Sequence, residues 1–220
     1  MGIQYWPGMK QNPDSQKAAM DDLAKTLNTE VILIPMNEYI QSGISALEVL
    51  KRVKSDCQTA IDNGFNNAVA FSSGASLFIA SSKDVKVENA VLLSPTLTPL
   101  NPAQRKKDKL SNEGKPHAKL SSQFTLYDGV LVFGYAFLAN LRISNLKGMS
   151  TLIIQGTEDE KNRPKGSIKL QNKLLQLDAQ DKDLHTLELI EGKHNLLSRG
   201  QTKEKSLVLI NDFINKKSIY

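Results

Sequence analysis

Short runs of apolar residues alternate with longer amphipathic segments along most of the chain. Six runs have the length and composition of strands: IQYW (3–6), EVILIP (30–35), NAVAFS (67–72), NAVLLS (89–94), STLIIQG (150–156) and HTLELIEG (185–192). Strand-like runs separated by helical patterns are typical of a parallel sheet whose strands are joined by crossover helices. The pattern therefore predicts an α/β fold with a mostly parallel, six-stranded sheet.

The segments between these runs carry the periodicity of helices. Asp14 or Ser15 is expected to cap a helix that continues to about Leu27. Apolar residues at three- and four-residue steps predict three further helices that cover the sheet. Their expected buried faces are Leu47, Leu50, Val53, Cys57 and Ile61, then Leu170, Leu174 and Leu177, and finally Leu207, Ile210 and Ile214. The expected architecture is a three-layer α/β/α sandwich.

One segment, from about residue 96 to 149, departs from this alternation. It contains the basic stretch NPAQRKKDKLSNEGKPHAKL (101–120) and then the aromatic run FTLYDGVLVFGYAFLANL (124–141). We interpret it as a lid-like insertion within a single domain that spans residues 1–220. Four aromatic residues could line a pocket or pack as one side of an amphipathic helix, and packing is the favoured interpretation: Tyr127, Phe133, Tyr135 and Phe137.

Composition narrows the class of protein. A chain of 220 residues can bury a substantial core within one domain. No apolar stretch approaches the roughly 18 residues of a membrane helix, and the start MGIQYWPGMKQ lacks the pattern of a signal peptide. We expect a soluble cytoplasmic protein without a membrane partner, with a processed secreted form as the alternative.

The single cysteine, Cys57, excludes an internal disulfide. The net charge of +5 comes largely from scattered lysines, which are typical of a solvated surface.

The stretch AFSSG (70–74) ends the third expected strand with two hydroxyls. Ala70 stands two residues before Ser72, and Gly74 stands two residues after it. This spacing fits a nucleophile elbow, a strained strand-to-helix turn that needs small neighbours. Ser73 fits less well, because Phe71 would then occupy a small position. A serine that merely caps the following helix is the structural alternative.

A nucleophilic serine needs a base and a carboxylate that orients the base. Asp159 follows the strand STLIIQG within GTEDE, and His194 follows HTLELIEG within KHN. The order Ser, Asp, His is that of enzymes with a nucleophile elbow. Glu158 and Glu160 are interpreted as solvated loop charges. His185 is interpreted as a structural histidine, and His117 as a surface histidine. The strand NAVLL is followed by Ser94 and Pro95, so no carboxylate competes there.

With these three motifs the sequence resembles the α/β-hydrolase family, particularly its small bacterial esterase-like and peptidase-like members. AFSSGAS resembles the family's elbow, LIIQGTED its acid loop and ELIEGKHNLL its histidine loop. The resemblance covers nearly the whole chain outside about 100–140. It implies that Ser72 is the nucleophile, Asp159 the orienting acid, and His194 the base that later protonates the leaving group.

The resemblance also implies an oxyanion hole of backbone N–H groups. One donor is expected from Ser73, after the elbow. The family often has His-Gly after the first strand, where this chain has YWPGMK (5–10). Pro7 has no N–H, so Met9 is the expected second donor, with Gly8 allowing close approach. Trp6 could wall the site or serve as a core aromatic.

We therefore predict a serine hydrolase that acts through an acyl-enzyme, with a small acyl ester as the first choice of substrate. Peptidase-like activity on short peptides and thioesterase activity are alternatives. No metal or organic cofactor is required, and no nucleic-acid partner is expected. A different class of function is a non-catalytic binding protein, in which a basic cluster holds an anionic partner: Arg105, Lys106, Lys107, Lys109, Lys115 and Lys119.

Overall fold

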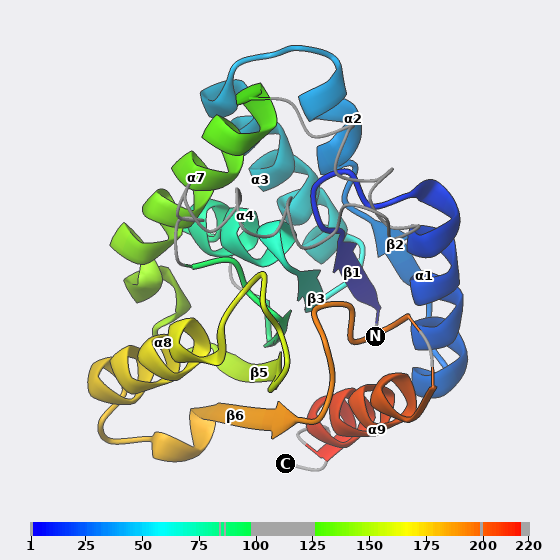
Figure 1. The fold of residues 1–220 in the computed structure, drawn as a ribbon, viewed down its shortest axis with the longest axis vertical. Helices are drawn as coiled ribbons and strands as arrows, with labels where there is room; N and C mark the ends of the chain where they lie inside the picture. The colour runs from blue at the N-terminus through cyan, green and yellow to red at the C-terminus, as the bar shows by residue number, and fades with distance from the viewer. Residues whose placement is uncertain (1, 84, 86, 98–125, 199, 217–220) are drawn as a thin grey trace.

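Six parallel strands form one sheet at the centre of the computed structural model, which describes residues 2–83, 85, 87–97, 126–198 and 200–216 (Figure 1). The strand order is β2-β1-β3-β4-β5-β6, and all five neighbouring pairs are parallel. The strands are β1 (Ile3–Trp6), β2 (Val31–Leu33), β3 (Asn67–Phe71), β4 (Asn89–Leu93), β5 (Ser150–Gly156) and β6 (His185–Ile190). The expected α/β class and parallel six-stranded sheet are confirmed.

The order of the strands reverses beside β1. After β1 the chain moves outward to β2 at one edge, then returns to β3 on the other side of β1 and continues to β6. Loops that follow β1 and β3 therefore leave the sheet in opposite directions, which opens a crevice at the carboxyl ends of these strands. The YWPGMK loop and the AFSSG turn both lie at this position.

Helices cover both faces of the sheet (Figure 1). The helices are α1 (Pro13–Leu27), α2 (Met36–Gln41), α3 (Ala46–Asp62), α4 (Ser73–Ser81), α7 (Leu126–Leu141), α8 (Pro164–Leu177) and α9 (Gly200–Lys216), with short 3-10 turns at Ile143–Leu146 and Lys182–Leu184. Apolar residues of α1 and α9 join one core cluster, whereas those of α2, α3, α4, α7 and α8 join the other. Alternate residues of each strand point to opposite clusters, as the pleat requires. The three-layer arrangement is confirmed.

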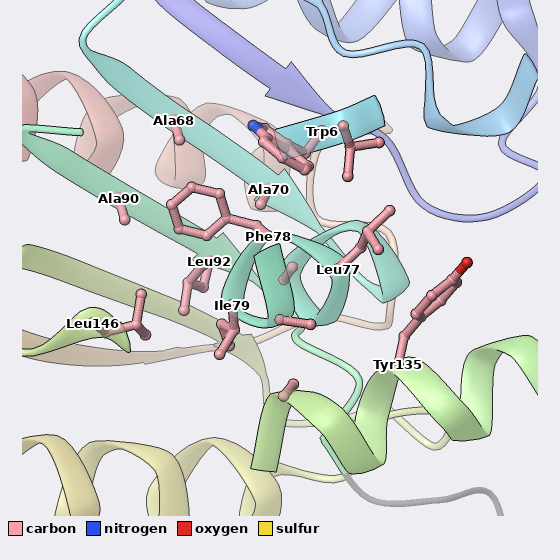
Figure 2. Close-up of a cluster of buried hydrophobic side chains, with 14 of the residues drawn as sticks. Trp6, Ala68, Ala70, Leu77, Phe78, Ile79, Ala90, Leu92, Tyr135 and Leu146 are labelled. Atoms are coloured by element: carbon pink, nitrogen blue, oxygen red, sulfur yellow. The ribbon is translucent and has the colours of Figure 1, made fainter. Parts of the chain in front are cut away.

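Helix α4 is buried along its whole length, because it lies between the sheet and α7. In Figure 2 the ring of Phe78, from this helix, lies between Ala70 and Ala90, whose small side chains leave room for it. The ring also meets the edge of Trp6, with 5.3 Å between centroids. Trp6 is fully buried, so the structure favours its interpretation as a core aromatic. The helix that follows the elbow is thus held rigidly.

Two details of the expected helices are wrong. Helix α1 begins one residue before Asp14, and the Asn12 side chain, rather than Asp14 or Ser15, accepts the capping hydrogen bond. Leu47 is 63 % exposed, because the buried stripe of α3 runs through Val49. Two residues correspond to about 200° of helical rotation, which turns Leu47 away from the sheet.

The described part of the expected insertion is mainly helix α7, which packs against α4. Tyr135 is buried there, as packing requires, but Phe133 and Phe137 are about half exposed. Their predicted packing is therefore wrong within the described structure. Residues 98–125, which include His117 and the whole basic cluster, lie outside the described residues, so the extent of the insertion stays a prediction.

Candidate active site

Ser72 occupies the turn between β3 and α4 in a conformation that few residues adopt. Its φ is +55° and its ψ is −120°, and it stands at the N-cap position of α4 without a side-chain capping bond. The capping alternative is therefore not what the side chain does. A Cβ on Gly74 would lie 2.2 Å from the Pro7 carbonyl oxygen, so only glycine fits at this position of the turn. The strained turn and its small neighbour match the expected nucleophile elbow.

The structure brings the three predicted side chains into one hydrogen-bonded chain. His194 Nε2 lies 3.0 Å from Ser72 Oγ, and His194 Nδ1 lies 2.9 Å from Asp159 Oδ2. The imidazole is positioned to accept the Ser72 proton at Nε2 while Nδ1–H donates to the carboxylate. Chemically, this arrangement can turn a serine hydroxyl into a nucleophile.

Asp159 is buried and accepts several hydrogen bonds besides that of His194. Its Oδ1 accepts from the backbone N–H groups of Lys161 and Asn162, each at 2.9 Å, and its Oδ2 accepts from Gln155 Nε2 at 3.1 Å. Burial by itself would raise the pKa of Asp159, but His194, the Asn162 N–H and the Gln155 side chain outweigh it and hold the pKa below its ordinary value. The carboxylate is therefore fixed in its charged form.

The other titratable candidates lie away from this chain of bonds. Glu158 and Glu160 flank Asp159 and are exposed. His185 lies at the start of β6, at the opposite end of the sheet, where its Nε2 is 2.8 Å from Asp178 Oδ2. These positions match the interpretation of the two glutamates as solvated charges and of His185 as a structural residue.

Two polar residues next to Ser72 were not predicted from the sequence. Thr96 Oγ1 lies 3.3 Å from Ser72 Oγ, and the Thr96 N–H donates to the Ser72 carbonyl oxygen. Asn162 Nδ2 donates to Thr96 Oγ1 at 2.8 Å and to the Ser94 carbonyl oxygen at 2.6 Å. Asn162 thus joins the loop after β4 to the acid loop. The only sequence signal was the position of Thr96 just past a strand, which many structural threonines share.

The loop after β1 lies against the turn that carries Ser72 and Ser73. Asn37 of α2 holds it on two sides: its Nδ2 donates to the Gly8 carbonyl oxygen, and its Oδ1 accepts from the Lys10 N–H. The Met9 N–H, however, donates to Ser73 Oγ at 2.7 Å. The roles of the Ser73 and Met9 N–H groups as oxyanion donors therefore stay predictions. In this structure the Met9 N–H already donates to a side chain of the protein.

The described residues contain no group of three or more His, Cys, Asp and Glu side chains that could hold a metal ion. Within the same part of the chain, no helix combines the length and apolar character needed to span a membrane. Cys57 is buried, and burial raises the pKa of its thiol to about 12, which makes it a poor nucleophile.

Comparisons with known proteins place the fold. No protein-family model and no curated protein sequence matches the chain. Solved structures do match along nearly the whole chain. A metagenome-derived lipolytic enzyme, from a study of LipS and LipT, is 14 % identical with a TM-score of 0.70, over 98 % of this chain and 93 % of its own. A monoacylglycerol lipase from Paleococcus ferrophilus is 15 % identical with a TM-score of 0.65, over 97 % and 93 %.

A third similar structure is a putative esterase from Staphylococcus aureus, which is 14 % identical with a TM-score of 0.65, over 97 % of this chain and 75 % of its own. Identities this low speak for the fold and not for the substrate. The agreement extends over the parallel sheet and its covering helices. The chain therefore has the α/β-hydrolase fold.

Proposed function

We propose that this protein is a serine hydrolase that cleaves small carboxylic esters through an acyl-enzyme. The observation that carries the proposal is the continuous hydrogen-bonded chain from Asp159 through His194 to Ser72, built from three loops at the carboxyl ends of β5, β6 and β3. The backbone strain at Ser72 supports it, because strained residues concentrate at functional sites.

In the proposed first step, Ser72 Oγ attacks the ester carbonyl carbon while its proton moves to His194 Nε2. The carbonyl oxygen becomes negatively charged, and the imidazolium is stabilised by Asp159. When the tetrahedral intermediate collapses, the bond to the leaving alkoxide breaks and His194 returns its proton to that oxygen. Water then attacks the acyl-enzyme with His194 again as the base, which releases the acid and restores Ser72.

An ester is the favoured substrate class for two reasons. The similar structures named above are described as a lipase, a lipolytic enzyme and a putative esterase. In addition, the side chains that hydrogen-bond to Ser72 Oγ within the described residues are His194 and Thr96, neither of which would recognise the charged end of a peptide. The preference for small acyl groups is part of the proposal.

The first experiment measures hydrolysis of p-nitrophenyl esters from acetate to decanoate, beside matched thioesters and aminoacyl amides. Ester turnover that falls with acyl length supports the proposal. If only the thioesters or only the amides were hydrolysed, the proposed substrate class would be wrong, whereas the proposed triad would stand. A fluorophosphonate probe should label the wild type once per chain, and Ser72→Ala should abolish both labelling and turnover.

Matched controls separate chemistry from folding. Ser81→Ala removes a buried serine at the far end of α4, whose hydroxyl donates only within that helix, and should leave labelling intact. His194→Ala should remove turnover, whereas His185→Ala removes the second histidine–aspartate pair, far from Ser72, and should affect stability only. A folded, accessible Ser72 that the probe never labels would refute the proposal.

A further inference from the structure

The side chain of Ser73 lies where the oxyanion hole of the proposed hydrolase is expected. Ser73 directly follows the nucleophile and is 4 % exposed. Its Oγ accepts the Met9 N–H at 2.7 Å, so the hydroxyl fills the acceptor position of one of the two expected oxyanion amides. A substrate oxygen that approached the Met9 amide would meet the Ser73 hydroxyl first.

That hydroxyl still has a proton to donate. A serine hydroxyl can accept two hydrogen bonds and donate one. The bond from Met9 uses one acceptor position, and among the described residues no hydrogen bond takes the Ser73 hydroxyl proton. The Ser73 backbone N–H, at the first turn of α4, is likewise without an acceptor in the described part of the chain. One residue next to the nucleophile therefore offers two donors.

The surroundings hold this hydroxyl in place. Asn37 fixes the Gly8 carbonyl oxygen and the Lys10 N–H on either side of Met9, so the Met9 amide has little freedom to turn. A Cβ on Gly8 would touch the Phe71 ring at 3.1 Å and Ser72 Cβ at 3.4 Å, which shows how closely this loop lies against the elbow. Donors that are fixed before the reaction stabilise a developing charge best.

We propose that the Ser73 hydroxyl is a catalytic residue that donates a hydrogen bond to the oxyanion. The Met9 N–H does not contact the oxyanion itself but donates to the Ser73 hydroxyl and polarises it. The oxyanion then accepts from Ser73 N–H and Ser73 Oγ–H, both on the residue that follows the nucleophile. Hydrogen bonds in such a chain strengthen one another, so the Met9 N–H makes the hydroxyl a better donor. This inference rests on the proposed function and assigns a side chain to its transition state.

The opposite role for Ser73 makes a contrary prediction. If Ser73 were a latch that keeps the Met9 amide from the substrate, its removal would free that amide and raise the rate. If the hydroxyl donates to the oxyanion, its removal lowers kcat, because the Met9 N–H is positioned to reach the hydroxyl and not the oxyanion. The two roles are thus separated by the sign of one effect.

The experiment compares Ser73→Ala, Ser73→Thr and Ser81→Ala with the wild type, using the best p-nitrophenyl ester and an alkyl boronic acid. The boronic acid forms a tetrahedral adduct on Ser72 with an oxygen in the oxyanion position. In Ser73→Ala we expect kcat to fall about 100-fold, as for loss of one oxyanion donor. KM should change by less than about threefold, and the boronic acid Ki should rise by the same factor as kcat falls.

The controls show what each result means. Complete fluorophosphonate labelling of Ser73→Ala would show that its fold and nucleophile are intact, and Ser73→Thr should recover most of the rate because it keeps a hydroxyl. If Thr does not fit the buried position, the parallel change of kcat and Ki in Ser73→Ala still decides. Unchanged or higher activity in Ser73→Ala overturns the hydroxyl donor alone. A wild type that is neither labelled nor active overturns the proposed function and this inference with it.

Discussion

Gly156 packs so closely against Gly192 that a Cβ on Gly156 would be 2.4 Å from the Gly192 carbonyl oxygen. The first residue ends β5, before the loop that carries Asp159, and the second belongs to the loop that carries His194. The same Cβ would lie 2.7 Å from the Lys193 carbonyl oxygen. The acid and histidine loops can meet only because no side chain separates them at this point.

Gly156→Ala should therefore lower kcat with little change in KM. The added methyl group pushes the backbone beside His194 outward, and a displacement of about 1 Å in a catalytic group costs on the order of 100-fold in rate. The overpacking should also destabilise the protein by roughly 1–3 kcal/mol. Steady-state kinetics and urea unfolding of the purified variant measure both effects, and wild-type kcat in this variant would contradict the loop contact.

Gly134→Ala is the matched control for this substitution. Gly134 lies in α7, and a Cβ at this position meets nothing within 4 Å. Because alanine is about 1 kcal/mol more favourable than glycine inside a helix, the variant should gain roughly 2–4 °C in Tm. Its esterase activity should match that of the wild type.

Asp159→Asn should remove catalysis and change the pH dependence of stability. The pKa of Asp159 is below its ordinary value of 3.8 in the folded protein. A lowered folded pKa stabilises the protein above pH 3.8, and this stabilisation is lost as the pH falls through the folded value. The gap in unfolding free energy between wild type and Asp159→Asn should thus shrink below pH 3.8. The rate at pH 7 should drop by about 10⁴-fold, since the imidazole loses its orienting charge.

Asp178→Asn provides the comparison for this result. Burial opposes the lowering of the Asp178 pKa, but the Gly148 N–H and His185 outweigh it, so this pKa also lies below its ordinary value. The variant should show a similar loss of stability above pH 3.8 while keeping its activity. If Asp178→Asn removed turnover, or if the Asp159→Asn gap stayed constant between pH 7 and pH 3, the assignment of Asp159 would be wrong.

The sequence alone was sufficient to predict the parallel sheet and the three loops that meet at Ser72. Strand ends are marked by local composition, and parallel strands place their carboxyl ends at one edge, so Ser72, Asp159 and His194 could be expected close together before any distance was known. Their convergence needed no knowledge of side-chain packing. It followed from the position of each residue just past a strand, from their order along the chain and from the resemblance to the α/β-hydrolase family.

The contacts that depend on three-dimensional packing could not be predicted in this way. Thr96 and Asn162 meet beside Ser72 from loops 66 positions apart, and neither residue type marks a catalytic site by itself. The bond between Met9 and Ser73 was missed for a related reason: a backbone amide has no sequence signature, and its acceptor is a side chain 64 positions away. Leu47 was assigned to the wrong face of α3, because apolar residues at steps of three or four can be read as either of two neighbouring helix faces.

Thr96→Val should lower kcat moderately while keeping the fold. Asn162 Nδ2 donates to Thr96 Oγ1, so the Thr96 hydroxyl proton is available to Ser72 Oγ and orients it. Loss of one neutral hydrogen bond of about 0.5–1.5 kcal/mol corresponds to roughly a twofold to twelvefold effect. Thr151→Val removes another buried threonine hydroxyl, which bonds to the Met149 carbonyl oxygen, and should leave kcat unchanged. Equal kinetics in both variants would exclude an orienting role for Thr96.

The ion pair between Lys10 and Asp128 ties the loop after β1 to the first turn of α7, and it should stabilise the protein more than a surface pair does. Lys10 Nζ lies 2.5 Å from Asp128 Oδ2, and the aspartate side chain is only 5 % exposed. Lys10→Met leaves this buried carboxylate without that partner, which should cost about 3 kcal/mol. Lys17→Met breaks an exposed pair with Asp21 and should cost less than about 1 kcal/mol. Because buried pairs are screened weakly, the difference between the two variants should persist in urea unfolding at 1 M salt. If both variants lost the same small stability, or if the Lys10→Met effect vanished in salt, the pair would not anchor α7 to this loop.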